Sequence, residues 1–507
     1  MSLLRFKNSY AKIIEPTCGL GSFLEAFIED NVESSKLIGW EINPNYVEHA
    51  NKTLQNITGE HNSIVKKKDF FKINWKDVKN KYKNSILFVG NPPWVTNSEL
   101  SILLSNNLPN KYNFKNLKGL EAMTGKSNFD ISEWMLIKLL DFISGTNSSI
   151  AFLIKTSVAR KLFQYVAKHK LLVSNFSIKA IDSKKYFNVN VDACLFLANG
   201  ITLHPADYTC PLYKKIDSSY PYKKMGIINN KLIADIDIYS NFSSFDSPSE
   251  FKWRSGVKHD ASKIMEFTIN QGSIVNGLGE IVDLPLDYLY PMYKSSQISR
   301  KTISTPNKYM LITQKKIGNK TKNIEIYSPK TWEYLVQHSS KLDARKSSIY
   351  KNNPRFSVFG VGDYTFLPWK IVISGLYKNI IFSKIGCYQD KPIVVDDTCY
   401  MLGFEYEEQA DFVLNILTSS LCRKFIESLV FLDNKRPITV SILNRINIKN
   451  IAKKLGQYEA YKCLFGNTES QLKLNINPTA SPANKPSHAF RLSEQLESYV
   501  PRSTSNV

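Results

Sequence analysis

The sequence predicts an α/β fold: a doubly wound parallel sheet in about the first 200 residues, followed by a domain of mixed α and β structure. Three observations predict it. Short apolar runs alternate with helical patterns from residue 12 to residue 198, as in parallel sheets covered by helices. A glycine turn follows the first apolar run, and ligands of open α/β sheets bind at such turns. After about residue 250 the alternation gives way to short strand-like runs rich in Tyr, Trp, Lys and Arg.

The elements of the first domain follow from two periodicities. Short, continuously apolar runs predict buried strands, and apolar residues spaced by three or four positions predict helices. The expected strands are 12–15, 37–42, 85–90, 149–155 and 191–198, and the expected helices are 21–29, 46–54 and 131–143.

The domain limits follow from changes in composition. A first domain is expected over 1–200, a connecting segment over 201–250 and a second domain over 251–465, with one clear helix at 407–429. Residues 466–507 are rich in Asn, Ser, Pro and Thr, which predicts a poorly ordered tail.

Charge and cysteine content narrow the class of protein. The net charge of +21 favours a polyanionic partner, with nucleic acid ahead of an anionic membrane surface. The seven cysteines form no Cys-x-x-Cys pair, which argues for reduced thiols in a cytoplasm and against a zinc site. The histidines form no metal-ligand cluster, no run has the length of a transmembrane helix, and the first twelve residues lack a signal-peptide core.

A cofactor site is expected where the first strand ends. Glu15 closes this strand, and the turn that follows contains Pro16, Thr17, Cys18, Gly19 and Gly21. The glycines permit positive φ and close approach of a ligand, and the Glu15 carboxylate can accept from an ammonium group. A lone Gly-x-Gly is more often a plain turn, so this segment gains weight only from later features.

Two of these features end the next strands. Glu41, followed by Ile42, is placed to hold both ribose hydroxyls of a nucleoside cofactor; the alternative is a surface carboxylate that caps the next helix. Asp69 can accept from an adenine amine, and the neighbouring Phe70 can cover the ring. Leu24 replaces the third glycine of a dinucleotide motif, which disfavours NAD.

The strongest motif is Asn91-Pro92-Pro93-Trp94, directly after the strand at 85–90. It resembles the Asn/Asp/Ser-Pro-Pro-aromatic hallmark of the DNA amino-methyltransferases. The Asn91 side-chain carbonyl and the Pro92 backbone carbonyl can accept hydrogen bonds from an exocyclic base amine and aim its lone pair at a methyl group. The prolines preorganise both acceptors, and Trp94 can stack on a base turned out of the duplex. The alternative is a Pro-Pro turn without function.

The order of the motifs narrows the resemblance. Cofactor motifs, then Asn-Pro-Pro, then a large C-terminal half is the order of the gamma-ordered adenine methyltransferases of restriction–modification systems, similar to the TaqI methylase. The resemblance implies a Rossmann-like catalytic domain that binds S-adenosyl-L-methionine and a C-terminal DNA-recognition domain. It implies methylation of N6 of a flipped adenine in double-stranded DNA, without a metal. It further implies a monomer in the bacterial cytoplasm, associated with the nucleoid, with a separately encoded restriction endonuclease as partner.

Further residues enter through the same resemblance. Residues 185–195 look like a strand hairpin whose aromatic residue, here Phe187, packs on the target base together with Trp94; a core Phe is the alternative. Phe129, just before the helix at 131–143, is expected to border the cofactor adenine. In the second domain basic residues interleave with aromatic ones, most densely at 314–320, which suits contacts to DNA phosphates and bases.

Three other functions stay open. Cytosine-N4 methylation would use the same mechanism, although Ser-Pro-Pro is commoner there. A methyltransferase of structured RNA or of a protein glutamine shares the motif but is usually short. A DNA-binding specificity module with an inactive methyltransferase lobe is the third, because family members usually carry a longer segment before the glycine turn than Met1 to Ile14. That segment packs on the cofactor methionine, so the chain start is truncated or this wall is built from elsewhere.

Overall fold

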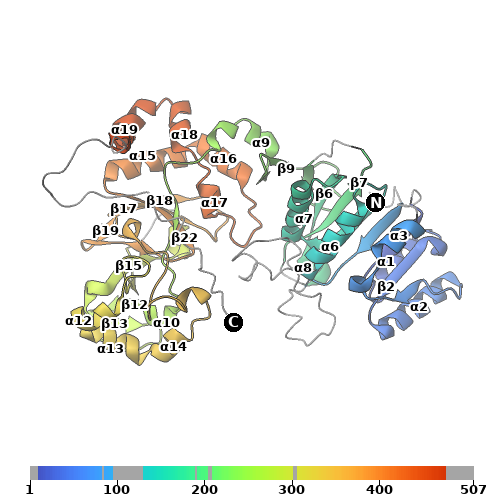
Figure 1. Ribbon diagram of the computed structural model, residues 1–507, viewed down its shortest axis with the longest axis horizontal. Coiled ribbons are helices and arrows are strands. Elements are labelled where there is room, and N and C mark those ends of the chain that lie inside the picture. Colours follow the sequence, from blue (N-terminus) through green and yellow to red (C-terminus); the bar gives the residue numbers. More distant parts are fainter. Residues whose placement is uncertain are drawn as a thin grey trace, which may run out of the picture. The chain divides into compact units, whose positions relative to one another are not determined.

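The computed structural model describes residues 10–82, 85–94, 130–188, 191–203, 208–300 and 305–474 (Figure 1). Residues 1–457 form one compact unit and residues 458–507 a second one. In the second unit the described structure is the helix α19 (Tyr458–Leu474). The predicted tail therefore begins inside a helix, and the part of it after residue 474 lies outside the described residues.

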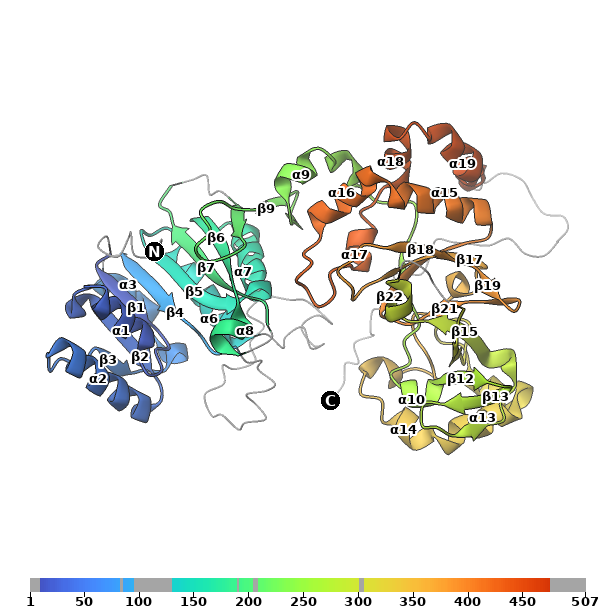
Figure 2. The ribbon, with the colours of Figure 1, turned by 180° about the vertical axis from the view of Figure 1, so that it is seen from behind.

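In the described part of the first unit, a ten-stranded sheet has the order β10-β9-β8-β6-β7-β5-β4-β1-β2-β3. Its strands are β1 (Lys12–Glu15), β2 (Leu37–Glu41), β3 (Val65–Lys67), β4 (Ile86–Gly90), β5 (Ser149–Lys155), β6 (Val173–Ile181), β7 (Ala193–Gly200), β8 (Thr209–Tyr213), β9 (Lys223–Ile228) and β10 (Lys231–Ile233). Figure 2 shows β1, β4, β5 and β7 side by side. This arrangement confirms the α/β class and every strand predicted for the first domain.

The sheet departs from the prediction in two ways. The five neighbouring strands β3, β2, β1, β4 and β5 are parallel to one another. Strand β7 runs antiparallel to both β5 and β6, so the sheet is mixed. The β6–β7 connection holds only the short helix α8 (Ser183–Phe187), and without a longer crossover the chain reverses direction. Strands β8 to β10 continue the same sheet, so the expected boundary near Gly200 falls inside it, and the expected connecting segment contributes three strands to the sheet.

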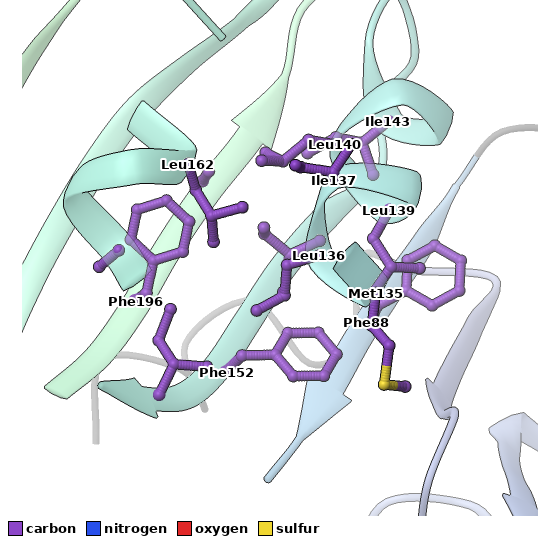
Figure 3. Close-up of a cluster of buried hydrophobic side chains, with 14 of the residues drawn as sticks. Phe88, Met135, Leu136, Ile137, Leu139, Leu140, Ile143, Phe152, Leu162 and Phe196 are labelled. Carbon is purple, nitrogen blue, oxygen red and sulfur yellow. The ribbon is translucent and has the colours of Figure 1, made fainter. Parts of the chain in front are cut away.

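Helices cover both faces of the sheet because apolar side chains alternate along its strands. Ile13 and Leu87 share a buried cluster with residues of α1 (Ser22–Glu29) and α2 (Pro44–Thr58). The next residues along these strands, Ile14 and Phe88, belong to the opposite cluster. That cluster also contains residues of α3 (Trp75–Lys81), α6 (Ile131–Ile143) and α7 (Thr156–His169). Figure 3 shows Leu136 and Leu140 of α6 facing Phe152 and Phe196 of the sheet.

The order of the strands also locates the site. Strand β1 lies between β2 and β4, so the chain turns to one side of β1 after the first helix and to the other side after the third strand. Ligands of open α/β sheets bind at the carboxyl edge where the strand order reverses in this way. The ends of β1, β2 and β4 carry Glu15, Glu41 and Gly90, so the candidate residues of three separate segments share this edge.

The remainder of the first unit is mixed α and β structure, as predicted. Among its described residues a four-stranded sheet has the order β11-β22-β17-β18, and a six-stranded sheet has the order β14-β13-β12-β16-β15-β21. The strands are β11 (Arg254–Ser255), β12 (Glu266–Asn270), β13 (Ser273–Asn276), β14 (Ile281–Val282), β15 (Leu289–Tyr293), β16 (Lys308–Leu311), β17 (Trp369–Ser374), β18 (Phe382–Ile385), β21 (Val394–Val395) and β22 (Cys399–Phe404), with β19 (Cys387–Tyr388) and β20 (Lys391–Pro392) as a separate pair. The helices are α9 (Ile236–Ser240), α10 (Ser262–Met265), α11 (Ser295–Ile298), α12 (Ile324–Tyr327), α13 (Pro329–Gln337), α14 (Ser339–Asp343), α15 (Glu407–Thr418), α16 (Ser420–Leu429), α17 (Val440–Leu443) and α18 (Ile448–Lys454).

The single helix predicted over 407–429 is two helices, α15 and α16, which break at Ser419. The Ser419 backbone is extended, and its hydroxyl accepts from the Cys422 N–H at 3.3 Å and donates to the Ile416 carbonyl at 2.6 Å. Serine side chains compete with helical hydrogen bonds in this way and favour helix ends. Apolar spacing alone could not reveal this break.

Across the described residues, no helix is long and apolar enough to cross a membrane. The same residues contain no group of three or more His, Cys, Asp or Glu side chains that could hold a metal ion.

Candidate active site

The glycine turn after β1 is held by backbone hydrogen bonds. Gly19 has φ of 53° and Gly21 has φ of 89°, so both positions require the conformational freedom of glycine, as predicted. The Gly21 N–H donates to the Cys18 carbonyl at 2.8 Å, and the Cys18 N–H donates to the Trp40 carbonyl of β2 at 3.0 Å. An added Cβ on Gly21 would lie in ordinary van der Waals contact, 3.4 Å from the Ala50 Cβ of α2, so the positive φ is what requires glycine here.

Glu41 at the end of β2 lies against this turn. Its Oε2 accepts from the Gly19 N–H at 2.9 Å, and its Oε1 accepts from the Ile42 and Asn43 N–H groups at 2.8 Å and 2.9 Å. A carboxylate accepts about four hydrogen bonds, so about one lone pair remains for a ribose hydroxyl. Asn43, and not Glu41, caps α2 through its bond from the Asn45 N–H. The alternative of a simple helix cap is therefore wrong for Glu41, and Ile42 is exposed beside it.

Glu15 is a buried acid, and one of its carboxyl oxygens has no hydrogen-bond partner in the described part of the chain. Its side chain is 2% exposed, and among the described residues no hydrogen-bond partner reaches its Oε2 or the buried Thr17 Oγ1. Burial, and then the negative charge of Glu41, raise the Glu15 pKa well above its ordinary value. An unpaired buried carboxylate is costly, and a ligand ammonium at this point would satisfy it. The amino group of a cofactor methionine fits this requirement. Pro16 and Cys18 are buried next to Glu15 and shape the turn without offering a charged group.

Of the two cofactor residues predicted after β3, Asp69 and Phe70, the structure differs from the prediction at Phe70. Asp69 accepts from the Phe71 N–H at 2.9 Å and caps a short turn. Phe70 is 4% exposed and packs edge-on against Phe71, Trp75 and Trp134, so it is a core residue. The half-buried rings next to it are Phe71 and Trp134, whose centroids are 4.7 Å apart. The sequence did not point to Trp134, because it lies on α6, far along the chain. The other aromatic candidate, Phe129, lies outside the described residues.

The Asn-Pro-Pro-Trp motif lies next to Glu15. The register of β1 and β4 pairs Ile14 with Phe88, which brings Gly90 beside Glu15. Gly90 has φ of 148°, and an added Cβ would lie 3.5 Å from the Glu15 Cγ and 3.4 Å from the Phe152 ring. Asn91 follows at once and is exposed, as the prediction of a substrate-binding amide requires. Pro92 is buried, whereas Pro93 is exposed and Trp94 is half-buried.

Trp94 and Phe187 meet although they are far apart in the sequence. Their ring centroids are 5.9 Å apart at an interplanar angle of 70°. Phe187 is 38% exposed, so it is not a core residue. It ends the helix α8 and does not lie on a strand hairpin, because residues 183–187 form a helical turn capped by Asp182. The pair therefore joins an exposed ring, Phe187, to a half-buried one, Trp94, which is three residues after Asn91.

Strand β5 holds Trp94 in place. The Trp94 indole N–H donates to the Leu153 carbonyl at 3.3 Å. The Lys155 ammonium donates to the Trp94 carbonyl at 3.0 Å and forms an ion pair with Asp130 at 2.7 Å. Sequence reasoning assigned no role to Lys155 or to Asp130, which directly follows Phe129, because only the fold brings both side chains to Trp94.

Comparison with known proteins places the chain in a family, although no family model matches it. The chain is 46% identical over 442 residues to the type II methyltransferase M.NspV of Nostoc sp., a match that covers 87% of this chain and 92% of M.NspV. Among solved structures, the type IIL restriction–modification enzyme MmeI in complex with DNA gives a TM-score of 0.52 at 14% identity. That match covers 88% of this chain and 63% of MmeI, and it shows the fold alone. A nuclease-deletion mutant of the type ISP enzyme LlaGI in complex with a DNA substrate mimic gives a TM-score of 0.47 at 11% identity, over 89% of this chain and 51% of that one.

The identity to M.NspV extends over nearly the whole of both chains, which is enough to establish a common family. The aligned region is long enough to include the strands that carry the buried acid, the glycine turn and the Asn-Pro-Pro-Trp motif, since it spans 442 residues. The chain therefore belongs to the type II methyltransferases, the DNA-modifying enzymes of restriction–modification systems, and its methyl donor is S-adenosyl-L-methionine.

Proposed function

We propose that this enzyme transfers a methyl group from S-adenosylmethionine to N6 of an adenine that is turned out of duplex DNA. One observation carries the proposal: Glu15 with an unpaired buried carboxyl oxygen, the exposed amide of Asn91 and the Trp94–Phe187 pair all belong to the same sheet edge. A cofactor held by Glu15 and a base held by the two rings would meet at Asn91.

The residues around the cofactor bind and orient it. Glu15 would pair with the amino group of the methionine, and Glu41 would accept from a ribose hydroxyl with its remaining lone pair. Asp69 has one carboxylate oxygen engaged by the Phe71 N–H, which leaves the other for an adenine amine. When bound, the sulfonium of the cofactor supplies an activated methyl group and a good leaving group, so the chain has only to position the nucleophile.

The motif residues would position that nucleophile. The lone pair of an exocyclic amine is delocalised into the base, which makes the amine a poor nucleophile. Asn91 Oδ1 and the Pro92 carbonyl would each accept one amine hydrogen and so direct the lone pair towards the methyl group. Pro92 and Pro93 restrict the backbone, so neither acceptor has to be reorganised during the reaction.

The aromatic pair favours a flipped base. An amine inside a stacked duplex is out of reach of a site at a sheet edge, so enzymes that modify bases extrude them. Trp94 and Phe187 offer exposed ring surface for such a base. Asn91 at the first motif position favours adenine over cytosine, for which Ser-Pro-Pro is commoner. The mixed second domain and the net charge of +21 would supply the contacts to duplex DNA.

The test is methyl transfer from labelled S-adenosylmethionine to unmethylated bacterial genomic DNA, followed by nucleoside analysis. N6-methyladenine is the expected product, and sequencing of the modified positions would give the target. N4-methylcytosine would retain the mechanism and change the base. Transfer to RNA or a peptide, with none to duplex DNA, would overturn the proposal, and so would DNA binding without cofactor binding.

The cellular setting belongs to the same proposal. We expect a monomer that works beside a separately encoded restriction endonuclease in the bacterial cytoplasm, on nucleoid DNA. Sedimentation of the enzyme with and without a target duplex would test the monomer, and genomic sites that resist cleavage only when this enzyme is present would reveal the nuclease.

A further inference from the structure

We propose that Lys155 is the positioning residue of the target-base pocket: its ammonium joins the Trp94 carbonyl to the Asp130 carboxylate and so holds Trp94 against Phe187. The inference rests on the proposed function, because it takes the Trp94–Phe187 pair as the base-binding surface. Lys155 does not touch the reacting atoms in this arrangement, so its role is to position and not to catalyse.

The geometry of the ammonium supports this role. Lys155 is the last residue of β5, and its Nζ lies 3.0 Å from the Trp94 carbonyl oxygen and 2.7 Å from Asp130 Oδ2. The two side chains of the ion pair are 22% and 8% exposed, so solvent screens the pair only in part. Charge-assisted hydrogen bonds at these distances are stronger than neutral ones.

Asp130 is itself immobilised. Its Oδ1 accepts from the Ser132 N–H at 3.1 Å and from the Ser132 hydroxyl at 2.6 Å, and it caps the N-terminus of α6. Ser132 is fully buried, and most of α6 belongs to the hydrophobic core. Asp130 Oδ2 is therefore a fixed acceptor, and it defines where the Lys155 ammonium lies.

Trp94 is held twice by the same strand. Leu153 accepts from the indole N–H at 3.3 Å, and Lys155, two residues further on, donates to the backbone carbonyl at 3.0 Å. The first bond fixes the ring and the second fixes the main chain of the motif. Without Lys155, Trp94 would keep the longer, neutral bond to Leu153, and the motif carbonyl and Asp130 would both lose this charged donor.

A displacement of Trp94 would reach the chemistry through the chain. The Pro92 carbonyl, one of the two proposed amine acceptors, is only two residues before Trp94. A misplacement of about 1 Å in a reacting pair can cost about a hundredfold in rate. Among the described residues, no hydrogen bond or ion pair joins Lys155 to Glu15 or Glu41, so the substitution should impair binding of the base and not of the cofactor.

The experiment compares Lys155→Met, Lys155→Arg and the control Lys161→Met in the full-length protein. Lys161 forms an ion pair of the same kind, at 3.0 Å to the buried Glu133, but belongs to α7. The readouts are kcat and KM on the mapped target duplex, cofactor affinity, thermal unfolding, and the fluorescence of 2-aminopurine in place of the methylated base. The fluorescence reports whether the base leaves the stack and stays in the pocket.

For Lys155→Met we expect kcat to fall by about a hundredfold, with cofactor affinity unchanged and an altered 2-aminopurine signal. Lys155→Arg keeps donors for both acceptors and should recover activity to within about tenfold of the wild type. Lys161→Met should stay within about threefold of the wild type in kcat, even if it unfolds at a lower temperature.

Two results would overturn the inference. One is a Lys155→Met enzyme with near-normal kcat, and the other is a loss of activity that follows thermal stability alone, equal to that of Lys161→Met and with an unchanged 2-aminopurine signal. Both presuppose that the wild type methylates the duplex. A wild type without methyl transfer would instead contradict the proposed function, so the two failures are distinguishable.

Discussion

At the scale of single residues, the site depends on a few groups whose surroundings differ from those of ordinary surface side chains. Asn91 follows Gly90 at the end of β4, and its exposed amide is not part of the hydrophobic core. We therefore predict that Asn91→Ala lowers kcat by a factor on the order of a hundred to a thousand, because a preorganised acceptor is lost. Cofactor and DNA affinities should stay near those of the wild type in equilibrium binding. Near-normal turnover would contradict the assigned reactive site.

Glu15 gives a prediction with a defined pH dependence. Its raised pKa means that, as pH rises, the folded, cofactor-free protein keeps the Glu15 proton to a higher pH than the unfolded chain does. The stability contributed by this proton is present at low pH and is lost as pH rises through the folded pKa. The Glu15→Gln protein lacks this titration, so in the absence of cofactor its melting temperature should exceed that of the wild type increasingly from about pH 5 upward. It should also bind the cofactor more weakly, because an amide cannot pair with an ammonium ion as a carboxylate does.

The exposed Glu48 on α2 supplies the control, and Glu48→Gln should follow the pH profile of the wild type. If melting temperature depended on pH in the same way in the wild type, Glu15→Gln and Glu48→Gln, the Glu15 carboxyl would not be the perturbed group. The motifs predicted where Glu15, Glu41 and Asn91 lie from local sequence alone, because Glu15 and Glu41 end strands and Asn91 directly follows one. Lys155 and Trp134 escaped prediction, because their contacts to Trp94 and Phe71 join distant segments.

At the scale of helices and strands, α2 connects packing with the cofactor site. Leu54 is 1% exposed on this helix, and its Cδ1 lies 3.8 Å from where a Cβ on Gly21 would be. Leu54→Ala should cost about 2–5 kcal/mol and weaken cofactor binding, because the cavity lies under the glycine turn. Ile57 on the same helix is 42% exposed, and Ile57→Ala should cost well under about 1 kcal/mol. Denaturant unfolding with cofactor titration would measure both, and equal costs for the two variants would contradict this packing.

Sequence patterns reveal some strands and helices of this protein and miss others. Strands β4 and β5 are continuous apolar runs, so they were predicted to within a residue. Strand β6 carries Ser, Asn and Lys and has a register shift between Ser174 and Ser177, so it lacks such a run and was missed. Strands β8 to β10 were missed for a related reason, because short strands at the end of a sheet need few apolar residues. The break at Ser419 came from a side-chain hydrogen bond that no apolar period encodes.

At the scale of the whole molecule, the net charge of +21 predicts how strongly DNA binding depends on salt. If about six phosphates are neutralised, the logarithm of the binding constant should fall with the logarithm of salt concentration with a slope of about −5. Fluorescence anisotropy of a labelled duplex across a range of salt would measure this slope. A slope near zero would contradict a phosphate-dominated interface and would remove the reason to treat the charge as functional.

Double Lys→Gln substitutions, each of which removes two positive charges, can identify the residues that produce this slope. Lys315 and Lys320 are exposed in the densest basic segment, and no ion pair to either is found among the described residues, whereas Lys316 is paired with Asp363 at 3.0 Å. The double variant Lys315→Gln/Lys320→Gln should make the slope shallower by about 2, since each phosphate contact contributes about 1. The control is Lys168→Gln/Lys170→Gln, at the end of α7 away from the site edge, which changes the net charge equally. If both pairs change the slope equally, the charge acts only as a general field, and the basic segment does not contact the phosphates.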